Sequence, residues 1–134
     1  MIRLVAGVAV ALAATAGSAL AQDGDPAEGE KAFRQCMACH AVGPDAKNKV
    51  GPQLNGIVGR QIGTAEGYAY GAPTKAKGAD GTVWTEDMLF EYLADPRAFV
   101  GGMSKMPMKF ANEPLRRNVI AYLKQFDAAG KRTQ

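Results

Sequence analysis

The chain has 134 residues, 16 of them basic and 13 acidic, which gives a formal net charge of +3. This small excess of positive charge is too weak to indicate a nucleic-acid partner, and the length suits a single domain. The chain contains only two cysteines and one histidine, so it cannot supply the four Cys or His ligands of a zinc ribbon.

Residues 1–21 have the three parts of a secretory signal peptide. Arg3 gives a positively charged start, Leu4 to Ala16 is a run of small and apolar residues, and Ala19-Leu20-Ala21 fits a small-x-small cleavage site. The alternative is a membrane anchor that stays in place, but the run is short and alanine-rich compared with the ~20 strongly apolar residues that span a bilayer. We therefore predict cleavage after the last of these residues, export to the periplasm, and one mature domain, residues 22–134.

The mature part opens with the start signals of a helix. Asp25 is a suitable N-cap, Pro26 takes the first helical position, and Glu28 follows three residues after the cap, as in a capping box. We predict a helix from this point to about Ala38. A glycine inside a helix costs about 1 kcal/mol relative to alanine, so Gly29 predicts the close approach of another element.

Cys36-Met37-Ala38-Cys39-His40 has the spacing of a covalent haem-attachment site. Residues three apart share a face of a helix, so both sulfurs can reach the two vinyl groups of one porphyrin, and His40 follows as the proximal iron ligand. A thioredoxin-like dithiol has the same Cys-x-x-Cys spacing, but no strand pattern flanks these residues. Coincidence in a chain of this length is the other alternative. Free thiols of an exported protein would be oxidised, whereas thioether bonds to haem c consume both Cys36 and Cys39.

Residues 41–83 contain nine glycines and three prolines and show little regular periodicity. Loops longer than ~12–15 residues are uncommon in a compact domain unless they have a function. A flexible linker would not need the apolar and aromatic side chains that this stretch carries, which are Leu54, Ile57, Val58, Tyr68 and Tyr70. We predict that the stretch wraps a large apolar cofactor, the porphyrin.

A second helix is predicted to begin after Thr85, a good N-cap, and to end before Pro96. Glu86 and Asp87 lie in its first turn, where the helix dipole favours negative charge. Its apolar residues repeat at helical spacing and are Met88, Leu89, Tyr92 and Leu93.

Residues 100–109 are predicted to form a loop that carries Met103, Met106 and Met108. The last helix is predicted to begin near Asn112, with Pro114 in its first turn, and to end before Gly130. Its apolar stripe consists of Leu115, Val119, Tyr122, Leu123 and Phe126. Residues 131–134 are predicted to be frayed.

Several segments between Asp25 and Phe126 match the motifs of one known family. They are Gly29…Phe33 before Cys36-x-x-Cys39-His40, Gly51-Pro52-x-Leu54-x-Gly56-x-x-Gly59-Arg60, Tyr68…Tyr70, Trp84, Tyr92-Leu93…Pro96, Ser104-Lys105-Met106 and Ala121-Tyr122-Leu123. With them the chain resembles the class I c-type cytochromes, and among these the bacterial cytochrome c2 group. The resemblance implies an all-α cytochrome c fold, in which three main helices, short ones and long loops wrap one covalently attached haem. It also implies that the first and last helices cross near Gly29 and pack through Phe33 and Tyr122.

The same resemblance implies roles for single residues. The Pro52 carbonyl would accept a hydrogen bond from the His40 ring, and Tyr92 would lie beside a methionine ligand of the iron. The haem propionates would receive hydrogen bonds from Arg60, Tyr70 and Trp84. Elementary electrostatics supports Arg60 independently, because a buried propionate needs a charged partner and arginine is the usual one.

Three methionines compete for the distal side of the iron. Met106 follows Ser104-Lys105 as in the family, and its distance to Ala121-Tyr122-Leu123 equals the distance in the photosynthetic-type relatives. Met108-Lys109-Phe110 imitates the Met-x-Phe of many relatives, and Met103 lacks the family's neighbours. We predict Met106 as the iron ligand, with Met108 and Met103 as the alternatives.

An iron bound between His40 and Met106 has no open site, so we predict one-electron transfer rather than catalysis. The alternatives are a haem enzyme or a ligand-sensing haem module, each with an exchangeable distal position. The resemblance implies a monomer that carries electrons between membrane complexes, from a cytochrome bc complex to a photosynthetic reaction centre or a terminal oxidase. Lysines are predicted to surround the exposed haem edge and to steer acidic partners. The candidates are Lys47, Lys49, Lys75, Lys77, Lys105 and Lys109.

Overall fold

The computed structural model describes residues 23–133, so the predicted signal peptide lies outside the described residues. Along the described part the helices are α1 (Pro26–Phe33), α2 (Ala72–Gly78), α3 (Glu86–Ala94), α4 (Pro96–Val100) and α5 (Glu113–Leu123). The only β pairing within residues 23–133 consists of two isolated bridges, Gln61 with Val83 and Phe126 with Arg132. The predicted all-α class is confirmed. None of the helices in this range is long and apolar enough to cross a membrane.

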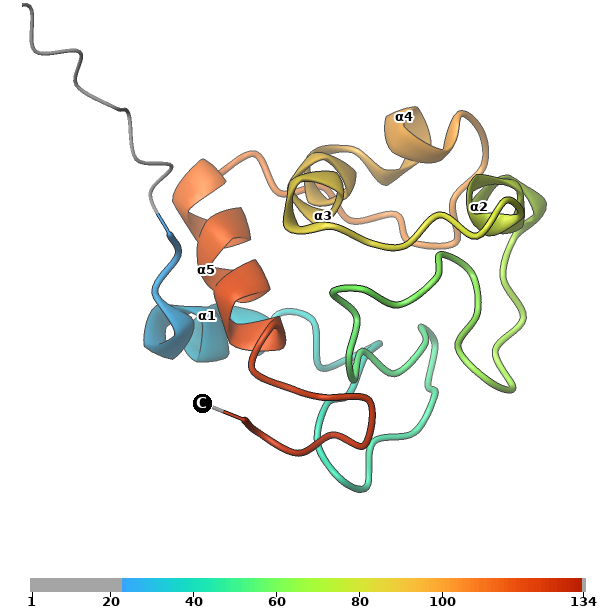
Figure 1. Cartoon of the computed structure of the whole chain (residues 1–134). Coiled ribbons are helices and arrows are strands. Elements are labelled where there is room, and N and C mark those ends of the chain that lie inside the picture. Colours follow the sequence, from blue (N-terminus) through green and yellow to red (C-terminus); the bar gives the residue numbers. More distant parts are fainter. Residues whose placement is uncertain (1–22, 134) are drawn as a thin grey trace, which may run out of the picture.

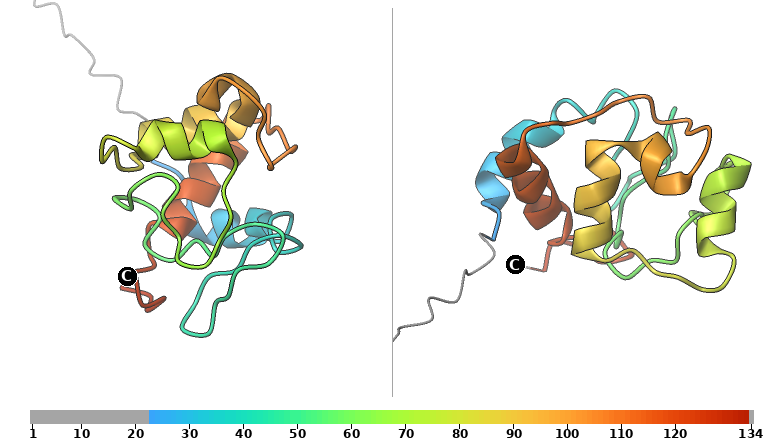
Figure 2. Two further views of the ribbon diagram at one scale, coloured as in Figure 1. Left: turned by 90° about the vertical axis from the view of Figure 1, so that its right-hand side faces the viewer. Right: turned by 90° about the horizontal axis from the view of Figure 1, so that it is seen from above.

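The helices lie in three groups along the molecule (Figures 1 and 2). The α1 and α5 helices pack against each other at one end, α3 and α4 lie in the middle, and α2 lies at the other end. The long segment between α1 and α2 runs along one side of this row, and the segment between α4 and α5 (orange in Figure 1) passes α3. Long loops therefore surround a small set of helices, as the sequence predicts.

The start of α1 follows from its N-cap. The Asp25 side chain accepts hydrogen bonds from the N–H groups of Ala27 at 2.8 Å and Glu28 at 3.2 Å, as predicted. The Glu28 carboxylate does not complete a capping box, because it binds the Lys31 ammonium at 2.7 Å instead. One half of the predicted capping arrangement is therefore present.

The end of α1 differs from the prediction, because the helix ends at Phe33 and not at about Ala38. After Phe33 the backbone bonds shorten to three-residue spacing: the Cys36 N–H donates to the Phe33 carbonyl at 2.7 Å, and the Cys39 N–H to the Cys36 carbonyl at 3.1 Å. Such tight turns are a common way to close a helix. The haem-attachment motif therefore lies in consecutive turns rather than in the last turn of an α-helix.

The contact between α1 and α5 is the main helix–helix contact of the fold. A β-carbon at Gly29 would lie 1.9 Å from the carbonyl oxygen of Asn118, so only glycine allows this approach. The rings of Phe33 and Tyr122 lie 5.4 Å apart, and Phe126 follows at 5.2 Å from Tyr122. The predicted crossing at Gly29 and its packing residues are confirmed.

Short helices were expected besides the three main ones, but the sequence analysis did not locate the two that the structure contains, α2 and α4. The α2 helix lies in the stretch expected to lack regular structure, and its N-cap, Gly71, provides no side-chain hydrogen bond that would mark it in the sequence. The α4 helix begins directly after α3 because Asp95 serves both as the C-cap of α3 and as the N-cap of α4. Pro96 thus ends one helix and takes the first position of the next.

The segment after α5 folds back along the helix end, and its predicted fraying is wrong for residues 131–133. The Thr133 N–H donates to the Gln125 carbonyl at 2.8 Å. Arg132 pairs with Glu30 of α1 at 3.3 Å, and its guanidinium lies over the ring of Phe126 at 5.2 Å. An ion pair and a cation–π contact therefore hold residues that the sequence presents as a polar tail.

Candidate haem-binding site

Cys36 and Cys39 are both half-buried, and they lie in the consecutive turns that directly precede His40. The His40 N–H donates to the Cys36 carbonyl at 2.9 Å, which fixes the histidine directly after the two thiols. Burial, and to a smaller extent Cys39, raises the pKa of the Cys36 thiol to about 11. A thioredoxin-like dithiol needs a lowered thiol pKa, so this environment argues against the redox-dithiol alternative.

The proximal side consists of His40 and the turn at Gly51-Pro52. The His40 ring donates from Nδ1 to the Pro52 carbonyl oxygen at 2.7 Å, and this tautomer leaves Nε2 free to bind a metal. A β-carbon at Gly51 would lie 2.4 Å from Cε1 of the ring, so the glycine makes room for the imidazole. Burial lowers the pKa of His40, which favours the neutral form that ligates iron.

Arg60 offers a positive charge inside the fold that the protein satisfies only in part. Its Nη1 donates to the carbonyl oxygens of Gln53 at 3.0 Å and Asn55 at 3.2 Å. Its Nε is buried and has no hydrogen-bond partner. Leaving a buried donor of a charged group unpaired costs free energy, so Arg60 has room for an acceptor that the polypeptide does not supply. A haem propionate is such an acceptor, and with His40 and the cysteines these residues fit a haem.

Tyr70 and Tyr68 lie on the loop that precedes α2. Their ring centroids are 4.7 Å apart, and the Tyr70 hydroxyl accepts the Ala65 N–H at 3.0 Å. Tyr70 also hydrogen-bonds the Arg60 side chain, an interaction that opposes the lowering of the Arg60 pKa by burial. The third predicted propionate partner, Trp84, is adjacent as well, because its backbone N–H donates to the Arg60 carbonyl at 2.9 Å. The structure thus brings together all three.

Trp84, the third predicted partner, belongs to a cluster of aromatic rings. Its ring lies 5.1 Å from that of Tyr92 and 5.4 Å from that of Phe99, and the rings of Tyr92 and Phe99 are 5.7 Å apart. Phe99 was not identified in the sequence. It follows Tyr92 by two helical turns, but Pro96 interrupts the helix between them and hides this spacing.

The distal methionines lie in the segment between α4 and α5, residues 101–111, which we call the distal strap. Met106 is half-buried, whereas the exposed fractions of Met103 and Met108 are 68% and 49%. The Met106 N–H donates to the hydroxyl oxygen of Ser104 at 3.2 Å, and Ser104 is itself buried. Burial raises the pKa of Tyr92, and a hydrogen bond between Tyr92 and Ser104 opposes this rise. Tyr92 therefore lies beside the residues that lead into Met106.

The six candidate lysines, some of which are predicted to surround the haem edge, are all exposed. Three of them are also tied to the fold: Lys49 to the Met37 carbonyl, Lys105 to the Ala69 carbonyl, and Lys109 to the Asp95 carboxylate at 2.6 Å. Lys77 lies over the ring of Phe99 at 5.2 Å. The sequence identified these lysines as surface charges but gave no sign of their partners.

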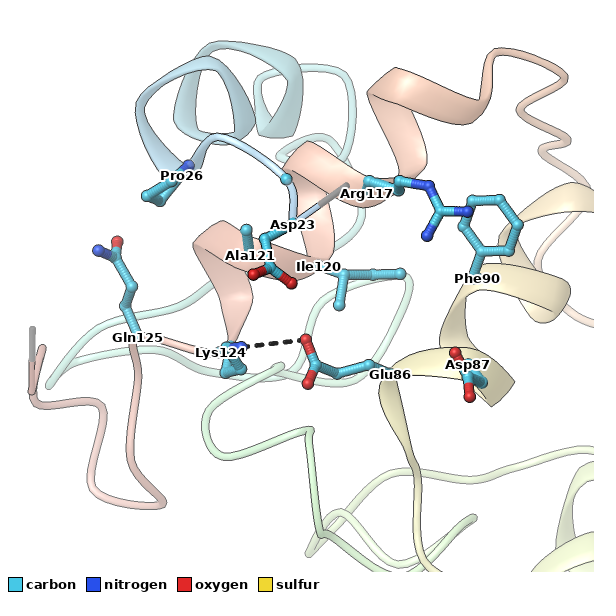
Figure 3. Close-up of a pocket in the computed structure, with 11 residues that line it drawn as sticks. Asp23, Pro26, Glu86, Asp87, Phe90, Arg117, Ile120, Ala121, Lys124 and Gln125 are labelled. Carbon is cyan, nitrogen blue, oxygen red and sulfur yellow. Dashed lines mark ion pairs between the residues drawn. The ribbon is translucent and has the colours of Figure 1, made fainter. Parts of the chain in front are cut away.

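A separate cavity of about 530 Å³ lies between α1, α3 and α5 (Figure 3). An ion pair between Lys124 and Glu86 at 3.2 Å crosses it, and Arg117 and Phe90 line one side. None of the residues predicted to bind haem lines this cavity. It is therefore distinct from the site built around His40.

Comparison with known proteins agrees with this site. The Cytochrome c family matches residues 26–127. Cytochrome c2 iso-1 of Rhodospirillum centenum is 48% identical over 118 residues, which cover 78% of this chain and 98% of the relative. Cytochrome c2 of Blastochloris viridis is 46% identical over 132 residues, which cover 98% of this chain and 99% of the relative.

Solved structures show the same similarity. The structure of cytochrome c2 from Rhodospirillum centenum matches with a TM-score of 0.75 at 48% identity, over 78% of this chain and 99% of that chain. Ferricytochrome c2 from Rhodopseudomonas palustris matches with a TM-score of 0.71 at 43% identity, over 77% of this chain and 99% of that chain. The predicted cytochrome c fold is therefore confirmed.

The family and the Cys-x-x-Cys-His spacing together show that the chain carries haem c, bound covalently through Cys36 and Cys39. They also show an electron carrier rather than an enzyme. The chain belongs to the cytochrome c family, as a class I c-type cytochrome similar to the bacterial cytochromes c2.

Proposed function

We propose that this chain carries single electrons on a haem iron ligated by His40 and Met106. When bound, the haem supplies the chemistry, which is the reversible change of its iron between the ferric and ferrous states. With a protein ligand on each side of the iron, no position is left for a substrate. The protein therefore serves as a carrier between two redox partners.

Pro52 would set the proximal side. Its carbonyl oxygen holds Nδ1 of His40 at 2.7 Å, which fixes both the tautomer and the orientation of the ring. Gly51 leaves the space that this orientation requires. A ring that cannot rotate keeps the same geometry in both oxidation states, so little reorganisation opposes electron transfer.

Arg60, Tyr70 and Trp84 would hold the propionate side. The buried, unpaired Nε of Arg60 supports this role, because a propionate oxygen would satisfy it with a charge-assisted hydrogen bond. Tyr70 hydrogen-bonds Arg60 and would add a second donor. Neutralising the propionate charge inside the protein allows the haem to be buried among apolar side chains.

The exposure of the three methionines is the observation that carries the distal assignment. Only Met106 is half-buried, whereas 68% of Met103 and 49% of Met108 is exposed. A ligand inside the fold is shielded from water, and Met106 is the least exposed of the three methionines. Its thioether is neutral and favours the ferrous state, which raises the reduction potential. Tyr92 and Ser104 would support the strap beside it.

The physiological partners would be acidic surfaces of membrane complexes. We infer a cytochrome bc complex as electron donor and a photosynthetic reaction centre or a terminal oxidase as acceptor, reached by a monomer in the periplasm. The six exposed lysines support steering by charge.

Export would require cleavage of residues 1–21, leaving residues 22–134 as the cytochrome domain. The mass of the exported protein tests this step: a mature N-terminus at Gln22 is expected, and retention of residues 1–21 would contradict it.

Three single variants test the ligand. In the ferric holoprotein a methionine sulfur bound to iron gives a weak absorption band in the far red. Met106→Ala is expected to abolish this band and to lower the reduction potential, because the thioether that favours ferrous iron is lost. Met103→Ala and Met108→Ala are the matched controls and should leave band and potential nearly unchanged. If Met106→Ala keeps the band and either Met103→Ala or Met108→Ala loses it, the methionine replaced in that control is the ligand.

A further inference from the structure

The distal strap has little backbone structure of its own. Of residues 103–111, only Phe110 makes a backbone–backbone hydrogen bond, from its N–H to the Leu93 carbonyl of α3 at 2.9 Å. The strap follows α4 at Gly101, whose φ of 72° is left-handed, and it ends at Asn112, the N-cap of α5. The position of the strap must therefore depend on contacts made by its side chains.

These side-chain contacts lie on both sides of Met106. Before it, Ser104 is buried and Lys105 binds the Ala69 carbonyl. After it, Lys109 donates from Nζ to Oδ2 of Asp95 at 2.6 Å, and the Phe110 ring is buried. Of these contacts, only the pair of Lys109 and Asp95 joins two opposite charges.

Asp95 connects the strap to the helices that precede it. Its Oδ1 accepts the Ala98 N–H at 3.1 Å and so caps α4, while its Oδ2 accepts the Lys109 ammonium. Asp95 and Lys109 are 14 positions apart, and the segment between them contains α4 and Met106. The ion pair therefore closes a loop around the proposed ligand. The pKa of Asp95 lies below its usual value, mainly because of the hydrogen bond from Lys109 and to a smaller extent because of the bond from the Ala98 N–H.

We propose that Asp95 and Lys109 form a latch that keeps the distal strap closed and Met106 in its iron-binding position. They are positioning residues, because they act on the ligand only through the strap. The proposal rests on the ligation of iron by Met106. It also gives Lys109 a role other than the steering of partners, since its ammonium is occupied within the chain.

Binding of imidazole to the ferric holoprotein tests the latch. Imidazole can bind the iron only when the strap opens and the distal sulfur leaves, so its apparent affinity measures the open fraction. Imidazole is neutral at high pH and small, and it does not use the docking surface of a redox partner. Asp95→Asn keeps an N-cap oxygen for α4 but removes the charge, and Lys109→Gln removes the other charge.

Each single variant is expected to bind imidazole about twofold to fivefold more tightly than the wild type. This is the change in the opening equilibrium that the loss of one exposed ion pair typically produces. The double variant should bind no more tightly than either single variant, because the same interaction is lost in all three. Lys124→Gln is the matched control, because it breaks the exposed Lys124–Glu86 pair at 3.2 Å and should leave the affinity unchanged. This pair joins the end of α5 to the start of α3, whereas the strap meets the opposite end of each helix. Hydrogen exchange of the Phe110 N–H, which donates to the Leu93 carbonyl, should accelerate in the latch variants and not in the control.

Two results would overturn the latch. In the first, the imidazole affinity of Lys109→Gln changes no more, relative to the wild type, than the affinity of the control Lys124→Gln does. In the second, the increase in imidazole affinity of the double variant equals the combined increases of the two single variants. This would show that Asp95 and Lys109 act independently. Failure of the latch is distinguishable from failure of Met106 ligation, because the far-red band of the wild type reports the ligand before any latch variant is made.

Discussion

A β-carbon placed on Gly29 of α1 would lie 1.9 Å from the carbonyl oxygen of Asn118 in α5. The two backbones therefore touch at this point, and the rings of Phe33 and Tyr122 extend the contact at 5.4 Å. Because α5 leads out of the distal strap and α1 leads into the cysteine motif, this crossing ties the two sides of the haem site together. A change at Gly29 should thus affect the whole fold.

Gly29→Ala is expected to destabilise the protein by about 2 kcal/mol or more. Alanine favours a helix by about 1 kcal/mol over glycine, but the clash with a backbone atom forces the helices apart and outweighs that gain. Chemical denaturation of the holoprotein measures the difference. Ala27→Ser, at an exposed position of the same helix, should change the free energy of unfolding by less than about 0.5 kcal/mol. Equal stability of Gly29→Ala and the wild type would refute the crossing.

Gly51→Ala is expected to displace the His40 ring. The added β-carbon would lie 2.4 Å from Cε1, so the hydrogen bond to Pro52 must lengthen or break. Weaker orientation of the proximal ligand should shift the reduction potential and the NMR signals of the His40 ring. Gly71→Ala is a suitable control, since its nearest neighbour, the Met103 carbonyl oxygen, would be at an ordinary 3.7 Å. Identical potentials in wild type and Gly51→Ala would contradict the proximal geometry.

Arg60→Gln is expected to lower the reduction potential by tens of millivolts. For a one-electron couple, about 60 mV corresponds to a tenfold change in the equilibrium constant of reduction. The Arg60 charge disfavours the more positive ferric state, and its removal also leaves a propionate without its partner. Redox titration measures the shift. Lys131→Gln removes the same charge at an exposed position near the C-terminus and should shift the potential far less. An unchanged or raised potential in Arg60→Gln would argue against propionate binding by this residue.

Lysine steering predicts a rate that depends on salt. With an acidic redox partner, the second-order rate constant should fall between low and moderate ionic strength, because added ions screen the attraction. Lys75→Gln on α2 should lower the low-salt rate by about twofold to threefold, and the difference should vanish at high salt. Lys31→Gln, on α1 at the other end of the molecule, serves as the control. A salt-independent rate would remove the argument for steering.

Much of the site could be predicted from sequence because its signals are local. The N-caps at Asp25, Thr85 and Asn112 accept the hydrogen bonds that their positions predict. The order of Cys36, Cys39 and His40 defines the cofactor without knowledge of the fold. Such short-range patterns depend on neighbouring residues only, so a single sequence is enough to recognise them.

The remaining features depend on contacts between distant residues. Pairing of Lys109 with Asp95 and of Arg132 with Glu30 leaves no mark in the local sequence. The end of α1 at Phe33 reflects a change to tighter turns, which helix propensity does not predict. The α4 helix was not recognised in the sequence because Asp95 caps both the end of α3 and the start of α4. In the sequence such a residue indicates only the end of the first helix.

The most direct test of the account is the intact mass of the purified, exported protein, measured together with its visible spectrum. We predict a mass equal to residues 22–134 plus one haem that survives denaturation, because thioether bonds from Cys36 and Cys39 hold it. The reduced protein should show the absorption bands of a c-type cytochrome. A colourless protein, or a mass that matches the bare polypeptide, would contradict the account.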